Sequence, residues 1–244
     1  MNTDKEHILK RKRVYNLTPF TLLDYPNKTA CIVWFSGCGM RCGYCYNTDI
    51  VESSGNYDYF EVLSFLHKRK GLLQGVVLCG GEPLFYYDKD MFEFIKKVKE
   101  MGFLVKLDTN GINYEALKEL VESNLIDYVA LDFKAPKYKF EYVTQNSIKK
   151  FDLFLYSLQF LIDAKIDFEL RTTFHPQLLN SDDIQDMIRL LESLDYHGKY
   201  YIQNFIESKS NFGDLKKEIR KINFDVLESD KIEIGYRNFD NYSL

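Results

Sequence analysis

The sequence predicts an α/β protein built as a partial, open TIM-like barrel of about six βα units. Short apolar segments alternate with longer amphipathic segments between residues 29 and 205, and this alternation is typical of βα units. The repeat length is close to the roughly 30 residues that one such unit needs. Because a closed TIM barrel needs about eight units, we expect this barrel to stay open.

The apolar segments are short enough for strands, and the amphipathic ones have the periodicity of helices. The predicted strands are residues 30–36, 75–79, 103–108, 127–132, 167–173 and 199–205. The predicted helices are residues 57–69, 89–101, 114–123, 147–164 and 182–194.

We expect three parts along the chain: an N-terminal arm over residues 1–17, the barrel domain over 18–205 and a C-terminal appendage over 206–244. The arm is basic, and we interpret it as a solvated chain end. The appendage contains a charged, helix-like stretch at residues 213–221 and a strand-like stretch that starts at Ile232.

The composition excludes several classes of protein. With 32 Lys and Arg against 36 Asp and Glu, the formal net charge is −4, which argues against a partner that is DNA or RNA. No apolar run approaches the roughly 18 residues of a membrane span, and the basic N-terminus lacks the apolar stretch of a secretory signal. We therefore expect a soluble, cytoplasmic protein whose cysteines are thiols, metal ligands or redox groups.

Polar side chains alternate with apolar ones along three successive predicted strands. The polar strand faces carry Lys106 and Asp108, Asp132 and Lys134, and Glu169 and Arg171. Fully buried parallel strands are normally apolar on both faces, and a buried charge needs a partner or a ligand. We therefore expect the sheet to enclose a polar cavity that holds the chemistry, the alternative being a half-exposed antiparallel sheet.

Three cysteines lie on the glycine-bearing loop that follows the first predicted strand. The loop reads GCGMRCGYCYN, so Cys38, Cys42 and Cys45 form a C-x3-C-x2-C arrangement. A structural zinc site needs four ligands, and Cys31 lies inside the apolar strand, where we expect it to pack. A cubane iron-sulfur cluster normally takes four cysteines, so three would leave one iron open. Zinc binding and plain thiols remain alternatives.

This cysteine spacing resembles the signature of the radical SAM superfamily. The resemblance implies a radical SAM core fold and a 4Fe-4S cluster held by Cys38, Cys42 and Cys45, with S-adenosylmethionine (SAM) chelating the remaining iron. One-electron reduction then cleaves SAM to methionine and a 5′-deoxyadenosyl radical. Tyr44 occupies the place of the superfamily's aromatic residue beside the adenine; the alternative is a tyrosine that only packs.

The second predicted strand ends in a glycine turn that reads LCGGEP. By itself the segment Gly80, Gly81, Glu82 is a turn that lets two backbones, or a backbone and a ligand, come close. It resembles the GGE element of the same superfamily, which implies that these three residues bind the methionyl amino group of SAM.

Four charged residues lie toward the carboxyl ends of later strands, where α/β barrels assemble active sites. They are Asp108, Asp132, Lys134 and Arg171. Similar elements occur in the superfamily branch that activates glycyl-radical enzymes, which implies contacts with SAM and with an entering substrate loop. The alternative is an internal ion-pair network that only neutralises itself. No general acid or base is assigned.

The segment before the first predicted strand, Thr18 to Lys28, indicates which branch of the superfamily the chain resembles. Thr21 and the Asp24, Tyr25, Pro26 triplet resemble the activating proteins of anaerobic ribonucleoside-triphosphate reductase, and the likeness covers roughly residues 17–205. It implies hydrogen abstraction from a glycine Cα of that partner, leaving a stored glycyl radical. Since the chain has no cysteine-rich ferredoxin insert, electrons are expected from a flavodoxin- or ferredoxin-like donor.

Three alternatives stay open. Pyruvate formate-lyase activase would differ only in its partner, and a 7-carboxy-7-deazaguanine synthase would need a closed pocket for a small molecule. A non-enzymatic iron-sulfur or zinc protein would need four protein ligands and no SAM pocket.

Overall fold

The computed structural model describes residues 11–216 and 227–239. The chain divides into two compact units, which we describe in turn. The first comprises Met1–Gly39, Asp49–Thr109 and Asn113–Val129, and the second comprises Met40–Thr48, Asn110–Ile112 and Ala130–Leu244. The cysteine loop therefore starts in the first unit and continues in the second.

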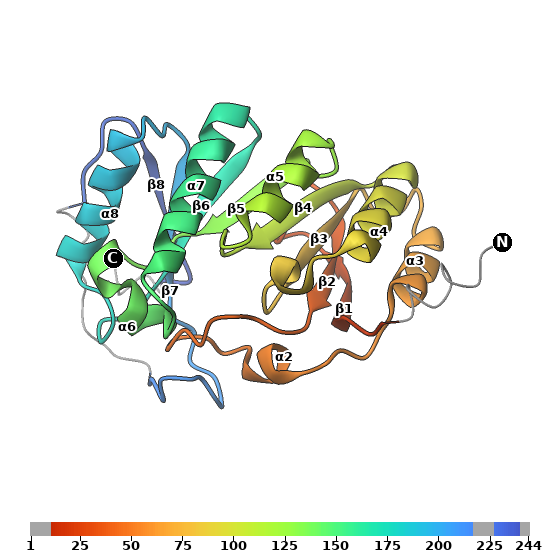
Figure 1. Cartoon of the computed structure of the whole chain (residues 1–244), viewed down its shortest axis with the longest axis horizontal. Coiled ribbons are helices and arrows are strands. Elements are labelled where there is room, and N and C mark those ends of the chain that lie inside the picture. The colour runs from red at the N-terminus through yellow and green to blue at the C-terminus, as the bar shows by residue number, and fades with distance from the viewer. Residues whose placement is uncertain (1–10, 217–226, 240–244) are drawn as a thin grey trace. The chain divides into compact units, whose positions relative to one another are not determined.

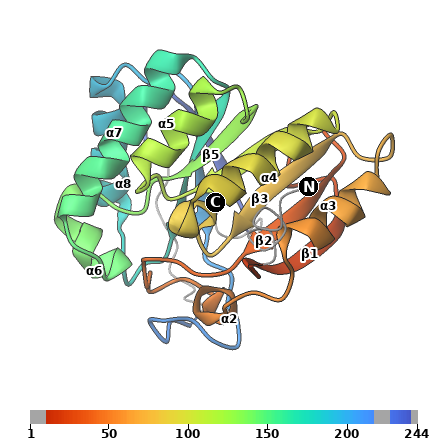
Figure 2. The same ribbon diagram turned by 45° about the vertical axis from the view of Figure 1, so that its right-hand side comes forward.

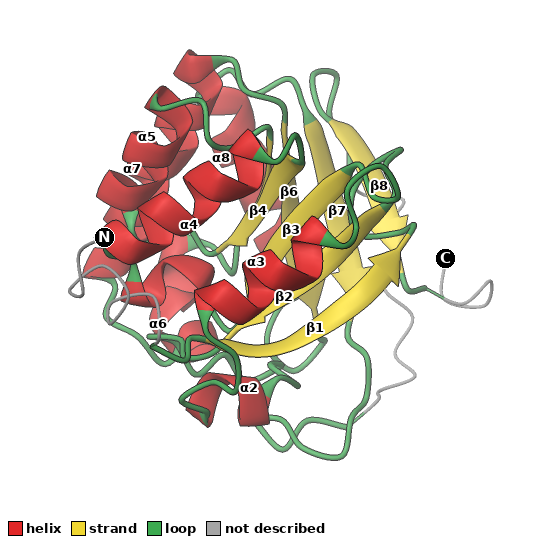
Figure 3. Cartoon of the chain, turned by 90° about the vertical axis from the view of Figure 1, so that its right-hand side faces the viewer, coloured by secondary structure: helices red, strands yellow, loops and turns green. Residues whose placement is uncertain are grey.

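The first unit is a sheet covered by helices. Its strands are β1 (Val14–Thr21), β2 (Ala30–Phe35), β3 (Gly75–Gly80) and β4 (Leu104–Thr109), and its helices include α3 (Tyr59–His67), α4 (Lys89–Glu100) and α5 (Tyr114–Glu122). β1 pairs with β2 antiparallel, whereas β2, β3 and β4 are parallel. Figures 1 and 2 show α3 and α4 side by side, and Figure 3 shows them on one side of β2 and β3.

Local sequence explains these elements. In β2 the run ACIVWF buries every residue except Trp34, as a strand covered on both faces requires. Helix α4 starts at the N-cap Asp88, whose carboxylate accepts hydrogen bonds from the Asp90 and Met91 N–H groups. The apolar face of α4 is fully buried and consists of Met91, Phe94, Ile95 and Val98. The resulting core holds the carboxyl ends of β2 and β3 in fixed positions.

The second unit repeats this plan. It contains β6 (Phe168–Phe174), β7 (Lys199–Asn204), β8 (Glu233–Arg237), α6 (Phe140–Thr144), α7 (Lys149–Ala164) and α8 (Ser181–Ser193). β6, β7 and β8 are parallel. On the face that α8 covers, the hydroxyls of Thr172 and Tyr200 are hydrogen-bonded at 2.7 Å, and Tyr200 also contacts Met187 of α8.

The opposite face of β6, β7 and β8 is polar. Arg237 of β8 donates two hydrogen bonds of 2.9 Å to the buried carboxylate of Glu169. Its guanidinium also lies 3.5 Å from the ring centroid of Tyr201. Burial alone would lower the pKa of Arg237, but the ion pair with Glu169 outweighs it and raises the pKa. The last described strand is therefore joined to the sheet by charge as well as by its backbone.

The described strands form an open sheet in the order β1 to β8, and β5 (Tyr128–Asp132) spans the boundary between the units. The predicted α/β class and the open arrangement are confirmed, and the predicted strands and helices agree with the observed ones within a few residues. Two further strands flank the six predicted ones: β1, and β8, where the strand-like stretch was noted.

Some segments differ from the predictions. Residues 14–17 of the predicted arm form the first half of β1, because their backbone pairs with β2. The short helices α2 (Thr48–Glu52) and α6 were not predicted, since a single turn carries too little periodicity to detect. Most of the helix-like stretch at 213–221 lies outside the described residues. Among the described helices, none combines the length and hydropathy needed to cross a bilayer.

Candidate functional site

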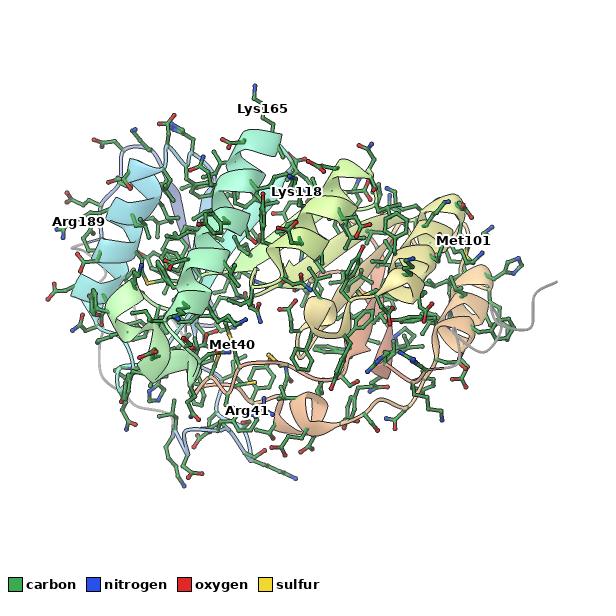
Figure 4. All side chains as sticks on the ribbon, viewed as in Figure 1. Met40, Arg41, Met101, Lys118, Lys165 and Arg189 are labelled. Carbon is green, nitrogen blue, oxygen red and sulfur yellow. The ribbon has the colours of Figure 1, made fainter. Side chains whose placement is uncertain are left out.

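The cysteine loop follows β2 directly. It starts at Gly37, whose φ of +82° is the left-handed conformation that favours glycine. Cys38 belongs to the first unit, and Cys42 and Cys45 belong to the second. In the second unit the N–H groups of Arg41 and Gly43 donate to the carbonyls of Thr144 and Val143, at 3.0 and 3.1 Å. Figure 4 labels Met40 and Arg41 in this part of the loop.

The thiols of the loop are of a kind that binds metals. Burial raises the pKa of Cys42 to about 11, although the nearby Lys134 ammonium lowers it, and burial also raises the pKa of Cys45. No disulfide is formed by any of the five cysteines, all of which are described. Among described residues, no three His, Cys, Asp or Glu side chains are grouped to hold a metal ion. The ligand set Cys38, Cys42 and Cys45 therefore stays a prediction.

The two remaining cysteines pack in the first unit. Cys31 lies in the middle of β2 with no exposed surface, and burial raises its pKa to about 12. Cys79 packs against the apolar cluster that contains Tyr25, Ile32 and Val77. The expectation that Cys31 packs as a small hydrophobe is confirmed.

The glycine turn at the end of β3 brings two backbones together. A Cβ on Gly80 would lie 2.3 Å from the Phe35 carbonyl oxygen, and a Cβ on Gly81 would lie 2.2 Å from the Gly37 carbonyl oxygen. The Glu82 N–H donates to that same Gly37 oxygen at 2.8 Å. The glycines are therefore required by the backbone that leads into Cys38, and this packing requirement exists without any ligand.

Glu82 is buried at the end of this turn. Its Oε1 accepts a hydrogen bond of 2.7 Å from the Thr109 hydroxyl and one of 3.1 Å from the Leu84 N–H. Thr109 is the last residue of β4, so the glycine turn and the end of β4 are connected through this carboxylate. The sequence analysis did not identify Thr109 as part of the site.

Asp108 lies beside Thr109 and forms an ion pair with Lys106 of the same strand. The Lys106 side chain is only 2% exposed and that of Asp108 is 10% exposed. The sequence analysis placed both on the polar face of this strand but did not assign Lys106 to the site. The spacing of two residues along a strand was the available signal, since it puts both side chains on one face.

In the second unit, Asp132, Lys134 and Arg171 form the ion triad. The Lys134 Nζ donates to Asp132 Oδ2 at 3.0 Å, and Arg171 donates to Asp132 Oδ1 at 3.0 Å. Burial alone would raise the pKa of Asp132, but Arg171 and Lys134 lower it below its usual value. Burial would lower the pKa of Lys134, yet Asp132 holds it well above the usual value. The strand pattern predicted that these charges share a face, and the ion pairs join them there. The contacts of Asp132, Lys134 and Arg171 with SAM stay a prediction.

Tyr44 lies next to the ion triad. Its side chain is buried, and Lys134 Nζ is 5.8 Å from the ring centroid. Burial raises the pKa of the hydroxyl well above 10. Among the described residues the Tyr44 hydroxyl meets no hydrogen-bond partner of ordinary length and angle, although it is near enough to Cys42 to lower the pKa of that thiol. A buried hydroxyl without a partner is costly, which points to a ligand that completes it.

The residues present fit the group that the sequence resemblance implies. Thiols are the ligands that iron-sulfur clusters require, and three of them lie within eight residues of one loop, at Cys38, Cys42 and Cys45. The ion triad supplies fixed charges, and the buried Tyr44 hydroxyl has no hydrogen-bond partner of ordinary geometry in the described part of the chain.

Comparison with known proteins agrees with this geometry. Residues 32–191 match the family model of the Radical SAM superfamily. A relative from Methanocaldococcus jannaschii, named as a glycyl-radical enzyme activating enzyme, is 30% identical over 211 residues, which cover 84% of this chain and 84% of the relative. The pyruvate formate-lyase-activating enzyme of Clostridium pasteurianum is 26% identical over 230 residues, which cover 86% of this chain and 94% of that enzyme.

The solved structure of Streptococcus suis SuiB has a similar fold. The TM-score is 0.64 at 13% identity, and the match covers 83% of this chain and 47% of that chain. This chain thus spans about half the length of SuiB, and the likeness concerns the fold alone. The family match and the Methanocaldococcus jannaschii relative show that the chain belongs to the radical SAM superfamily, in the family of glycyl-radical enzyme activating enzymes.

Proposed function

We propose that this protein is an activase that installs a glycyl radical on an anaerobic ribonucleoside-triphosphate reductase, using a 4Fe-4S cluster and SAM. The observation that carries the activase part is the similarity to the archaeal relative, which extends over most of both chains. The choice of reductase rests on the segment before β2, with Thr21 and Asp24 to Pro26. In the structure Thr21 donates a hydrogen bond to Asp24, and Tyr25 is buried against Gly75.

The three loop thiols, Cys38, Cys42 and Cys45, would hold the cluster. When bound, the reduced cluster supplies the electron that cleaves SAM to methionine and a 5′-deoxyadenosyl radical. The protein would supply charged side chains for the methionyl ammonium and carboxylate of SAM, and a polar aromatic side chain for its adenosyl part. Fixed charges that need no reorganisation on binding favour a zwitterionic ligand.

The proposed SAM contacts divide between two chemical roles. The carboxylates of Glu82, Asp108 and Asp132 suit the methionyl ammonium, and the cations Lys134 and Arg171 suit the methionyl carboxylate. In the ligand-free protein these charges neutralise one another within the ion triad, and the bound cofactor would offer them further charged partners. Gly80 and Gly81 hold the turn, and we assign to Tyr44 the contact with the adenosyl part.

The product radical would take a hydrogen atom from one glycine Cα of the partner. The 5′-deoxyadenosyl radical becomes 5′-deoxyadenosine, and the glycine retains the unpaired electron. An open barrel suits this task because a protein loop is a bulky substrate. The proposed electron donor is a small flavodoxin- or ferredoxin-like protein.

The test is anaerobic reconstitution followed by reaction with SAM and dithionite. We expect 5′-deoxyadenosine, and with the reductase present we expect a glycine-centred radical by electron paramagnetic resonance. A reductase variant with its radical glycine changed to alanine is the matched control and should give no such signal. A fully loaded protein that yields no 5′-deoxyadenosine would contradict the radical SAM activity.

Pyruvate formate-lyase is the second candidate partner. It is favoured by the match with the Clostridium pasteurianum activase, which covers 94% of that enzyme. Parallel assays with the reductase and with pyruvate formate-lyase discriminate, because the activase should produce the glycyl radical in one partner much faster than in the other.

A further inference from the structure

We propose that a tight turn at residues 211–215 is a positioning element for the cysteine loop, and that it keeps the Cys42 thiol in place for its metal. We call it the 211–215 turn; it reads NFGDL and follows β7. The turn, the loop segment Met40–Thr48 and α6 all belong to the second unit. The inference rests on the proposed function, because it explains how a predicted ligand of the 4Fe-4S cluster is held before the cluster binds.

Gly43, the residue directly after Cys42, is held by two separate elements. Its N–H donates a hydrogen bond of 3.1 Å to the Val143 carbonyl of α6. Its carbonyl accepts a hydrogen bond of 2.9 Å from the Gly213 N–H, in the middle of the 211–215 turn. Because both backbone groups of Gly43 are bonded to other parts of the unit, the backbone that carries Cys42 has little freedom to rotate.

The contact requires a glycine at position 213. A Cβ on Gly213 would lie 2.9 Å from the Gly43 carbonyl oxygen and 3.0 Å from the Gly43 Cα. Both distances are shorter than an ordinary van der Waals contact. The φ of Gly213 is not positive, so close approach to the loop, and not backbone strain, is the reason for a glycine here. A side chain at this position would push the turn away from the loop.

The side chain of Asn211 fixes the shape of the turn. Its Nδ2 donates a hydrogen bond of 2.8 Å to the Leu215 carbonyl, and its Oδ1 accepts one of 2.7 Å from the Leu215 N–H. Both residues are buried, whereas Gly213 is exposed. An asparagine that bonds both backbone groups of a later residue closes a turn from inside. The turn is therefore held in shape by its own contacts and not by the loop.

The segment that contains the turn is anchored at both ends to the carboxyl end of β6. At its start, the Phe205 N–H donates to the Phe174 carbonyl at 3.0 Å. At its end, Nε2 of the fully buried His175 lies 2.9 Å from the Lys216 carbonyl oxygen. The Gln177 N–H donates to the other ring nitrogen, so Nε2 carries the proton and is the donor. These anchors hold the turn against the loop.

Two further contacts join this segment to the loop on either side of Gly43. The Arg41 guanidinium, on a residue labelled in Figure 4, is 5.3 Å from the centroid of the Phe212 ring. The hydroxyls of Thr48 and Ser210 are hydrogen-bonded at 2.9 Å. A loop that is already ordered loses less conformational freedom when it binds a ligand. The turn should therefore favour both the capture and the retention of the cluster.

The first experiment uses the full-length protein without cofactors and compares Gly213→Ala and Asn211→Ala with wild type. The probe is iodoacetamide, and mass spectrometry of peptides measures the rate at which Cys42 is alkylated. Cys31, buried in β2, reports unfolding of the whole protein in the same sample. We expect alkylation of Cys42 to become about tenfold faster in both variants, because the loop opens locally more often. Cys31 should stay as protected as in wild type.

The second experiment uses the anaerobically reconstituted proteins and measures how fast an iron chelator removes iron from the cluster. We expect iron loss to be several-fold faster in Gly213→Ala and Asn211→Ala than in wild type. Asp214→Gly is the matched control, since Asp214 is the exposed neighbour of Gly213 and its φ of +50° suits a glycine. This variant should resemble wild type in both experiments.

Alkylation of Cys42 at the wild-type rate in both variants would overturn the proposal. Equal acceleration of Cys31 and Cys42 would also overturn it, because the turn would then stabilise the whole fold and not the loop. Failure of the proposed function has a separate signature: wild type with a full cluster, reduced by dithionite, would make no 5′-deoxyadenosine. The alkylation rates, measured without cofactors, do not depend on that outcome.

Discussion

Strand β2 and the loop that follows it each contain a buried cysteine, and the two differ in their surroundings. Cys31 is enclosed by apolar neighbours in β2, where burial raises its pKa to about 12. Cys42 is almost as buried on the loop, but the Lys134 ammonium opposes the effect of burial and its pKa is about 11. A cation lowers the pKa of each thiol, Arg69 for Cys31 and Lys134 for Cys42, so neither burial nor a nearby charge separates the two. The comparison teaches that the backbone does: Cys31 is held inside a strand, whereas Cys42 lies on the loop that carries the predicted ligands.

The largest expected effect comes from exchanging these cysteines. Cys42→Ser should lose essentially all cluster iron and sulfide and all 5′-deoxyadenosine formation, since a cluster cannot keep an open iron with only two protein ligands. Cys31→Ser is the matched control and should retain iron. Iron and sulfide analysis after anaerobic reconstitution measures both. If Cys31→Ser lost as much iron as Cys42→Ser, Cys31 would not be the packing residue that its place in β2 indicates.

The next largest effect is expected at Lys134, whose charge lowers the pKa of Cys42. Lys134→Met leaves Asp132 with Arg171 alone, so we expect the free energy of unfolding to fall by about 2 kcal/mol. Lys137→Met breaks an ion pair with Asp152 that is half exposed on both sides, and the expected loss is about 0.5 kcal/mol or less. Urea denaturation of both proteins without cofactors measures the difference. Equal losses would show that the ion triad is no stronger than a surface pair.

The stabilisation by the ion triad should also depend on pH. The pKa of Asp132 in the folded protein is lowered, below the unfolded value of about 3.9. The stabilisation by the ion triad is therefore present above about pH 4 and is lost as the pH falls through the folded pKa. We expect wild type to exceed Asp132→Asn in stability near pH 7, with the gap narrowing below pH 4. A gap that widened in acid would have the wrong sign for a lowered pKa.

The smallest effect is expected at Tyr44, beside Cys42. Tyr44→Phe removes a buried hydroxyl that has no ordinary hydrogen bond in the described structure, so the cofactor-free protein should gain about 1 kcal/mol of stability. If SAM completes that hydroxyl, the variant should bind SAM more weakly than wild type. Thermal unfolding with and without SAM tests both statements. A variant less stable than wild type without cofactor would mean that the hydroxyl already has a partner.

Much of the fold could be predicted because its signals are local. The apolar run of β2 and the amphipathic pattern of α4 fix element type within a few residues. Alternation along β5 and β6 also placed Asp132, Lys134 and Arg171 on one face. Strand β1 was missed because its edge position leaves polar and apolar residues mixed, and pairing with β2 is not visible in one segment.

The site was harder to predict where contacts join distant segments. Nothing near Glu82 in sequence indicates the hydrogen bond from Thr109, 27 residues later. The need for Gly81 came from the Gly37 backbone, which only the folded sheet brings close. Residue types therefore predicted the chemistry, while the partners of each side chain depended on tertiary packing.

The pairing of β8 with β7 makes the protein sensitive to C-terminal truncation. A version that stopped before residue 227 would lose the Arg237 pair with Glu169 and leave a row of unsatisfied amides and carbonyls along β7. An exposed edge strand of that kind pairs with strands of neighbouring molecules. We therefore expect the shortened protein to aggregate during purification. Strand β8 thus covers an edge of β7 that would otherwise be open.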